Sequence, residues 1–159
     1  KNKSLSASIK ELGLSKKSFS FGMVLIGLGI FLSIFALEIL VGLLSVITKV
    51  KINTNVSVVL QGAPIWFLLF AIFVTPFCEE ILFRGFLVPR IGILLSAFVF
   101  GLLHADYNST FGIEIIAAFI FGIIAGYVFK KTKSLYPSII AHGIVNGITL
   151  FTTFVLMMH

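Results

Sequence analysis

Five apolar runs, separated by short polar segments, determine what this chain can fold into. They cover about residues 19–47, 63–88, 91–105, 111–129 and 135–158, and about 20 apolar residues are needed to cross a bilayer as a helix. The 159-residue sequence is 58% hydrophobic and only 11% charged, whereas soluble domains are about 25% charged. We therefore predict an integral membrane protein with an all-α fold, a polytopic membrane helix bundle of about five transmembrane helices.

The basic residues predict how these helices are oriented. With the N-terminus in the cytoplasm and five alternating spans, the inside segments hold ten Lys and Arg residues and the outside segments hold two. The outside residues are Lys49 and Lys51, and the inside residues are Lys1, Lys3, Lys10, Lys16, Lys17, Arg84, Arg90, Lys130, Lys131 and Lys133. Because cytoplasmic loops carry the excess of Lys and Arg, we expect the N-terminus to be cytoplasmic.

Residues 1–18 form a basic, amphipathic segment ahead of the transmembrane domain, which covers residues 19–159. Leu5, Ile9 and Leu12 share one side of a helix, so we expect this segment to lie at the membrane surface. The formal charge of +6 does not predict nucleic-acid binding. The basic residues fall between apolar spans and do not cluster with aromatic residues on one face, so we expect no nucleic-acid partner.

Three polar motifs lie inside or at the ends of the apolar runs, where charged side chains are rare. A charged group at the centre of a bilayer costs about 2.5–3.5 kcal/mol on insertion scales, and such residues usually have a function. The motifs are Glu79-Glu80-x-x-x-Arg84, Phe100-x-x-x-His104 and His142-x-x-x-Asn146. The helical rise places Glu79, His104, His142 and Asn146 at a similar depth, about 10–20 Å from the cytoplasmic ends of their spans.

The spacing within the motifs predicts which side chains share a helix face. Residues four apart lie about 40° apart around a helix, so Glu80 can pair with Arg84. Phe100 can support the ring of His104 for the same reason. Glu79 lies about 100° from Glu80 around the helix, so we expect it to face the other polar groups.

Structural roles are expected for several other residues. The predicted topology places Glu38 and Glu114 near the outer ends of their spans, so we expect them to be packing or interface groups. Gly122 and Gly126 have the spacing that allows two membrane helices to approach closely. Pro89 predicts a tight turn between the second and third spans.

One carboxylate, two imidazoles and an amide in a low-dielectric cavity suit hydrolysis. A carboxylate removed from water is a stronger general base, and an imidazole can hold the attacking water or share its proton. A second imidazole and an amide can donate hydrogen bonds to a developing oxyanion. We expect a polar cavity that opens to the cytoplasmic side between the second, third and fifth spans.

Other interpretations of these residues stay open at this point. Glu79, His104 and His142 have the ligand types of a Zn²⁺ site, but the sequence has no His-Glu-x-x-His motif, so we rank that site below a metal-free one. Cys78 is a weaker candidate for a nucleophile, and as the single cysteine it forms no internal disulfide. His142 and Asn146 are also of the type that forms hydrogen bonds between membrane helices.

Taken together, the three motifs resemble those of a known family. The similar segments are Glu79-Glu80-Ile-Leu-Phe-Arg84-Gly, Phe100-Gly-Leu-Leu-His104 and Ser134-Leu-Tyr-Pro-Ser-Ile-Ile-Ala-His142-x-x-x-Asn146. In order and spacing they are similar to the motifs of the CPBP (Abi) family, which includes type II CAAX prenyl endopeptidases and proteins of bacteriocin processing or immunity. The resemblance implies an intramembrane glutamate protease whose core covers about residues 63–150.

The resemblance also implies a catalytic role for four residues. Glu79 would activate the water together with His104. His142 and Asn146 would form the oxyanion hole. This mechanism needs neither a cofactor nor a metal.

Glu80 and Arg84 would support that site. The partners implied are the lipid bilayer and a peptide or membrane-protein substrate. The composition, rich in Lys, Ile and Phe, suggests a bacterial cell membrane as the location. Two other functions stay open. One is a non-cleaving immunity or signalling scaffold, and the other is a small proton-coupled transporter, which is less expected because the five spans contain no repeat.

Overall fold

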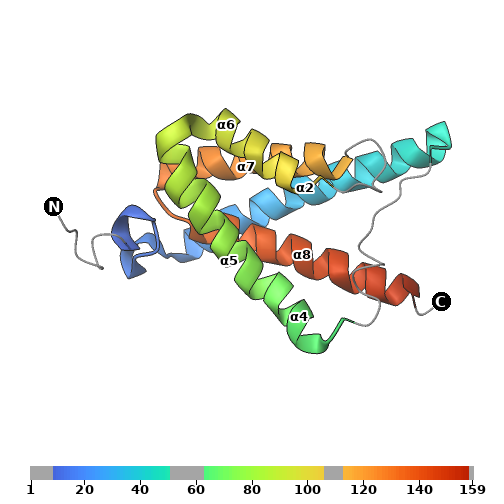
Figure 1. Cartoon of the computed structure of the whole chain (residues 1–159), viewed down its shortest axis with the longest axis horizontal. Coiled ribbons are helices and arrows are strands. Elements are labelled where there is room, and N and C mark those ends of the chain that lie inside the picture. The colour runs from blue at the N-terminus through green and yellow to red at the C-terminus, as the bar shows by residue number, and fades with distance from the viewer. Residues whose placement is uncertain (1–8, 51–62, 106–112, 158–159) are drawn as a thin grey trace.

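The computed structural model describes residues 9–50, 63–105 and 113–157, and within these ranges the regular structure is entirely helical. The elements are the 3₁₀-helix η1 (Lys16–Ser18), α2 (Phe21–Thr48), α4 (Ile65–Leu69), the π-helix η2 (Phe70–Val74), α5 (Thr75–Glu80), the π-helix η3 (Ile81–Leu87), α6 (Val88–Leu103), α7 (Ile113–Thr132) and α8 (Tyr136–Met157). The predicted all-α bundle is confirmed (Figure 1).

Four helical stretches of the described residues are long and apolar enough to cross a membrane. They are Phe21–Thr48, Ile65–Leu103, Ile113–Thr132 and Tyr136–Val155. The second has 39 residues and would be about 59 Å long if straight, about twice the thickness of the hydrocarbon core. It instead reverses direction well past its middle and forms a longer and a shorter arm (Figure 1), so the path of the chain agrees with about five spans.

The reversal occurs at Gly92, whose φ of 84° and ψ of 171° lie outside the helical region and are accessible mainly to glycine. Beyond it the chain runs back along its own first arm. The Ser96 hydroxyl donates to the carbonyl oxygen of Phe83 at 2.9 Å, and the rings of Phe83 and Phe100 lie 4.9 Å apart. The predicted turn at Pro89 is therefore wrong in position, because Pro89 lies within the helix and the chain reverses at Gly92.

Glycines let α6 and α7 pack closely, as their spacing predicted. A Cβ atom at Gly122 would lie 2.8 Å from the Cβ of Ala97, and one at Gly126 would lie 3.0 Å from the Cγ2 of Ile93. Real Cβ atoms essentially never approach a neighbour as closely as the first of these distances. The α6–α7 contact therefore depends on the missing side chain at Gly122.

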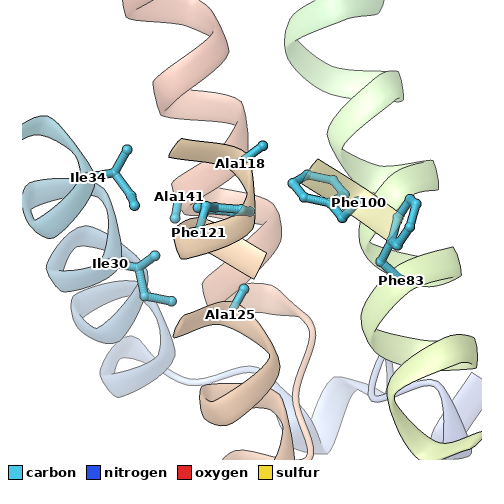
Figure 2. Close-up of a cluster of buried hydrophobic side chains, with 8 residues drawn as sticks. All are labelled: Ile30, Ile34, Phe83, Phe100, Ala118, Phe121, Ala125 and Ala141. Atoms are coloured by element: carbon cyan, nitrogen blue, oxygen red, sulfur yellow. The ribbon is translucent and has the colours of Figure 1, made fainter. Parts of the chain in front are cut away.

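The hydrophobic core lies where α2, η3, α6, α7 and α8 meet, as Figure 2 shows. Its buried members are Ile30, Ile34, Phe83, Phe100, Ala118, Phe121, Ala125 and Ala141. The alanines on α7 and α8 leave space that the aromatic rings of Phe100 and Phe121 occupy. These two rings also form one wall of the polar site described below.

The segment that precedes α2 packs against the loop between α7 and α8. The N–H of Leu135 donates to the carbonyl oxygen of Gly13 at 3.1 Å, and the hydroxyl of Ser134 donates to the carbonyl oxygen of Ser18 at 2.8 Å. Gly13 has a φ of 75°, a conformation that ends a helix. Of the amphipathic helix expected over residues 1–18, positions 1–8 lie outside the described residues, and residues 9–11 are helical.

We call this end of the bundle the basic end, defined by Lys16, Lys17, Lys130, Lys131 and Lys133. These residues belong to η1 and to the end of α7 with its following loop, which the contacts just described bring together. The ends of α2 and α8 lie at the opposite end of the bundle (Figure 1).

Candidate active site

Both carboxylates of the first motif lie on a short α-helix between two π-helical segments. Glu79 and Glu80 are the last residues of α5, which is preceded by η2 and followed by η3. π-Helical turns are rare and often occur at functional sites. The sequence did not predict them, although Pro76 in the first turn of α5 marks a place where regular α-helical bonding cannot continue.

Glu80 and Arg84 form the predicted ion pair. The Nη1 atom of Arg84 lies 3.0 Å from Oε1 of Glu80, and both side chains are fully buried. The guanidinium group also lies over the ring of Phe100, with Cζ 4.2 Å from the ring centroid, and 5.1 Å from the centroid of Phe121. The charge of Arg84 is therefore balanced by one carboxylate and by the faces of aromatic rings.

His142 connects the two glutamates. Its Nδ1 atom lies 3.0 Å from Oε1 of Glu80, and its Nε2 atom lies 3.7 Å from Oε2 of Glu79. An ionised carboxylate only accepts hydrogen bonds, so Nδ1 of His142 carries a proton and donates it in a hydrogen bond to Glu80. The contact between Glu80 and His142 was not predicted, because the sequence indicates pairs within a helix and not which faces of two distant helices meet.

His104 lies at the end of α6, where its ring is fixed by the residue one turn before it. Its Nδ1–H donates to the carbonyl oxygen of Phe100 at 2.8 Å, since a carbonyl can only accept. The two rings lie 4.4 Å apart, so the predicted support of His104 by Phe100 is present. This hydrogen bond leaves Nε2 of His104 available to water or substrate.

The predicted catalytic residues of the first two motifs therefore meet His142 in space. Glu79, His104 and His142 each offer one nitrogen or oxygen atom, and these atoms all lie within 4.8 Å of one another. Glu79 keeps 29% of its side chain exposed, whereas His142 keeps 6%. Oε2 of Glu79 has no hydrogen-bond donor among the described residues, and it is therefore available to accept a proton.

Asn146 lies on α8, four residues beyond His142, and faces the same cavity. Its amide nitrogen donates to the carbonyl oxygen of Ala71 in η2 at 2.9 Å. This is a hydrogen bond between helices of the kind that the sequence also allowed. A side-chain amide has two N–H groups, so this bond leaves one of them for a second acceptor.

A cavity of about 860 Å³ adjoins this cluster. His104, His142 and Asn146 line it together with residues of α2, α6, α7 and α8, and most of the lining is apolar. Glu79 is not among the lining residues, but its carboxylate lies within 4.8 Å of a ring nitrogen of each of the two lining imidazoles. A space of this size and composition is typical of sites that bind apolar ligands or peptide side chains.

The cavity extends away from the basic end, which corrects the expected opening. It reaches Thr48 near the end of α2, Ile113 at the start of α7 and Thr152 on α8, all at the end of the bundle opposite to the basic lysines. None of residues 63–88, the second span predicted from the sequence, lines it. At the basic end Leu12 packs against Gly85, where a Cβ atom would lie 2.9 Å from the leucine side chain.

Glu38 and Glu114 line the same cavity. Both lie farther from the basic end than the histidines, as their predicted depth required. Glu38 comes from α2 and Glu114 from the first turn of α7. The cavity thus has the polar cluster at its inner end and two acidic residues along its walls.

Glu79, His104 and His142 also form a candidate site for a metal ion. Their types suit Zn²⁺, and Glu80 and the Phe100 carbonyl hold the two imidazoles by their other nitrogens, as outer residues do in metal sites. Ligands about 2.0–2.1 Å from a tetrahedral ion lie about 3.4 Å apart, and the three ligand atoms here all lie within 4.8 Å of one another. By type and proximity the three residues could therefore hold a metal ion.

Within the described residues, the fold and site define a class of protein: a polytopic membrane helix bundle with a buried cluster of carboxylates, imidazoles and an amide beside an apolar cavity. The model of the family described as Type II CAAX prenyl endopeptidase Rce1-like matches residues 61–148. This match covers more than half of the chain and includes all three motifs, and the chain belongs to that family.

One curated relative is similar over part of its length. The uncharacterized protein YpbD of Bacillus subtilis (strain 168) is 30% identical over 81 residues, which cover 51% of this chain and 42% of that protein. The chain thus spans less than half of the relative that it matches. No solved structure matches the chain significantly.

Proposed function

We propose that the chain is a metal-independent intramembrane endopeptidase that cleaves a membrane-associated or hydrophobic peptide with a water molecule activated by Glu79. The observation that carries this proposal is the approach of Glu79 to two imidazoles, with all three reactive atoms within 4.8 Å of one another. Family membership supports proteolysis in general. The glutamate mechanism and the class of substrate are our own inference.

The first step is attack by water on the scissile carbonyl. Glu79 takes one proton from the water while Nε2 of His104, left free by the bond to the Phe100 carbonyl, accepts a hydrogen bond from it. The water oxygen bonds to the carbonyl carbon and gives a tetrahedral intermediate. Glu79 then delivers its proton to the peptide nitrogen, the C–N bond breaks, and the acid and amine products leave.

The second requirement is stabilisation of the oxyanion. His142 and Asn146 line the cavity on one face of α8, where each can donate a hydrogen bond to that oxygen. When Nε2 of His142 also carries a proton, the two glutamates, Arg84 and the imidazolium form a group with no net charge. Such a group costs less in a low-dielectric site than an unbalanced one.

We also propose a bacterial cell membrane as the location, with the basic end in the cytoplasm. An N-terminus inside and five spans leave the C-terminus outside. Fusion of the C-terminus to alkaline phosphatase should therefore give an active reporter, and fusion to green fluorescent protein should give a dark one. The opposite result would reverse the orientation.

The direct test compares peptides in the membranes and medium of three strains by mass spectrometry: wild type, a deletion, and Glu79→Gln at normal protein level. If Glu79→Gln accumulates the same uncleaved peptides as the deletion, the proposal is supported and the substrate is identified. If Glu79→Gln matches the wild type while the deletion does not, the protein acts by binding, as a scaffold or immunity protein would. Cys78→Ser is the matched control, and its peptides should match the wild type.

A further inference from the structure

Glu38 is an acidic residue inside a membrane span that the mechanism does not use. It lies ten residues before the end of α2, lines the cavity, and makes no ion pair or hydrogen bond with another described residue. It also lies outside the segment 61–148 that defines the family. Because an ionisable side chain at this depth is costly, an unpaired glutamate facing a binding cavity suggests a ligand that supplies the opposite charge.

The position of Glu38 follows from the packing of α2 against α8, which run in the same direction away from the basic end (Figure 1). A Cβ atom at Gly27 would lie 2.8 Å from the carbonyl oxygen of Pro137 and 3.2 Å from the Cβ of Ile140. Glu38 lies eleven positions beyond Gly27 on α2. Eleven positions beyond Pro137 and Ile140 on α8 are residues 148 and 151. Glu38 is thus level with Thr149, which also lines the cavity.

Thr149 lies seven positions beyond His142, or about 10 Å along the helix. An extended peptide covers about 3.3 Å per residue, so a group held at the level of Glu38 belongs to a residue about three positions from the bond that is cleaved. The walls between these levels are apolar, and include Ile34, Leu37 and Val145. The cavity thus presents an apolar stretch with one carboxylate on α2.

We propose that Glu38 binds the cationic side chain of a Lys or Arg residue in the substrate, about three residues from the scissile bond and within an otherwise apolar segment. This inference rests on the proposed function. A lysine or arginine matches the charge of Glu38, and its long apolar stem can lie along the apolar wall.

The binding test uses the full chain in nanodiscs with Glu79→Gln, so that the probe is not consumed. The probes are two labelled apolar peptides that differ at one position, where one has lysine and the other norleucine, and binding is measured by fluorescence anisotropy. We expect the lysine peptide to bind about tenfold more tightly, as one charge-assisted hydrogen bond implies. Adding Glu38→Gln should remove this preference, and Glu38→Asp should keep part of it. Glu38→Lys should instead favour a third peptide that has glutamate at the same position.

Glu11→Gln is the matched control, because it makes the same change at an exposed position on the other side of the bundle. It should keep the preference for lysine. Equal affinity for the two peptides in the protein that retains Glu38 would overturn the inference, as would a preference that survives Glu38→Gln.

A cleavage test with the same two peptides separates this inference from the proposed function. Glu79-dependent cleavage that is indifferent to the lysine would overturn the role of Glu38 and leave the protease proposal intact. Absence of Glu79-dependent cleavage, together with a lysine preference that depends on Glu38, would overturn the protease proposal and support Glu38 as a binding residue.

Discussion

The side-chain amide of Asn146 donates a hydrogen bond to the carbonyl oxygen of Ala71, which joins α8 to the π-helix η2 over 2.9 Å. The backbone explains why this carbonyl is available. In η2 the N–H of Thr75 bonds to the carbonyl of Phe70, five residues back, and the next N–H in that pattern would belong to residue 76. Pro76 has no N–H, so Asn146 supplies the donor that the backbone lacks.

This relationship predicts that Asn146 and Pro76 are energetically coupled. Asn146→Ala should lower the free energy of unfolding by about 1 kcal/mol, because the carbonyl of Ala71 loses its donor. Pro76→Ala restores a backbone N–H near that carbonyl, so Asn146→Ala should cost clearly less in the Pro76→Ala background. A double-mutant cycle measured by SDS titration and circular dichroism tests this, and equal costs in both backgrounds would mean that the two residues act independently.

The buried ion pair predicts that its members depend on each other for stability. Arg84→Met should lower the free energy of unfolding by about 3–5 kcal/mol, because Glu80 would then be left as a buried charge with no cation of its own. Glu80→Gln in the same chain should recover part of this loss, since the uncompensated carboxylate is removed. The same titration measures both effects. If the double variant loses as much unfolding free energy as Arg84→Met and Glu80→Gln lose in total, the two residues are not coupled.

Chelation distinguishes the metal-free mechanism from a Zn²⁺ mechanism at the same residues. Because Glu79 and His104 activate the water molecule directly in the proposed mechanism, we expect cleavage to persist after treatment with 1,10-phenanthroline. The control is 1,7-phenanthroline, which does not chelate in the same way. If only the chelating isomer abolishes cleavage, and added Zn²⁺ restores it, the mechanism is metal-dependent.

The contact between α6 and α7 makes a prediction for the glycines. Gly122→Ala should lower the free energy of unfolding by about 1–3 kcal/mol, because the new Cβ would lie 2.8 Å from that of Ala97. Gly29→Ala is the matched control, since nothing lies within 4 Å of its added Cβ, and it should be neutral or slightly stabilising. Equal effects of the two substitutions on unfolding would show that helix packing does not depend on Gly122.

Contacts within one helix were predictable because they depend only on the spacing of residues. The four-residue steps from Glu80 to Arg84 and from Phe100 to His104 place each pair on one face, and both contacts are present. The apolar runs likewise predicted where the long helices lie. The helical rise also predicted that Glu79 and the two imidazoles lie at a similar depth, and their reactive atoms lie within 4.8 Å of one another.

Contacts between helices were not predictable from spacing, because they depend on how each helix is rotated. The bridge from His142 to Glu80 requires α8 and α5 to face each other at one level. The bond from Asn146 to Ala71 also depends on a change from α- to π-helical bonding at Pro76. The expected direction of the cavity was wrong. At the basic end Leu12 packs closely against Gly85, and Leu12 is followed by a non-helical backbone at Gly13, which helix spacing does not predict.

Glu80 and Arg84 lie on one continuous helical arm, so they can pair as soon as that arm becomes helical, without help from any other part of the chain. During synthesis the arm therefore meets lipid with its two charges already balanced, which lowers the cost of inserting it. His142 follows 62 residues after Glu80 and arrives when its carboxylate partner is already in the membrane. A circularly permuted chain that began with α7 would reverse this order and expose His142 to lipid before Glu80 had been made.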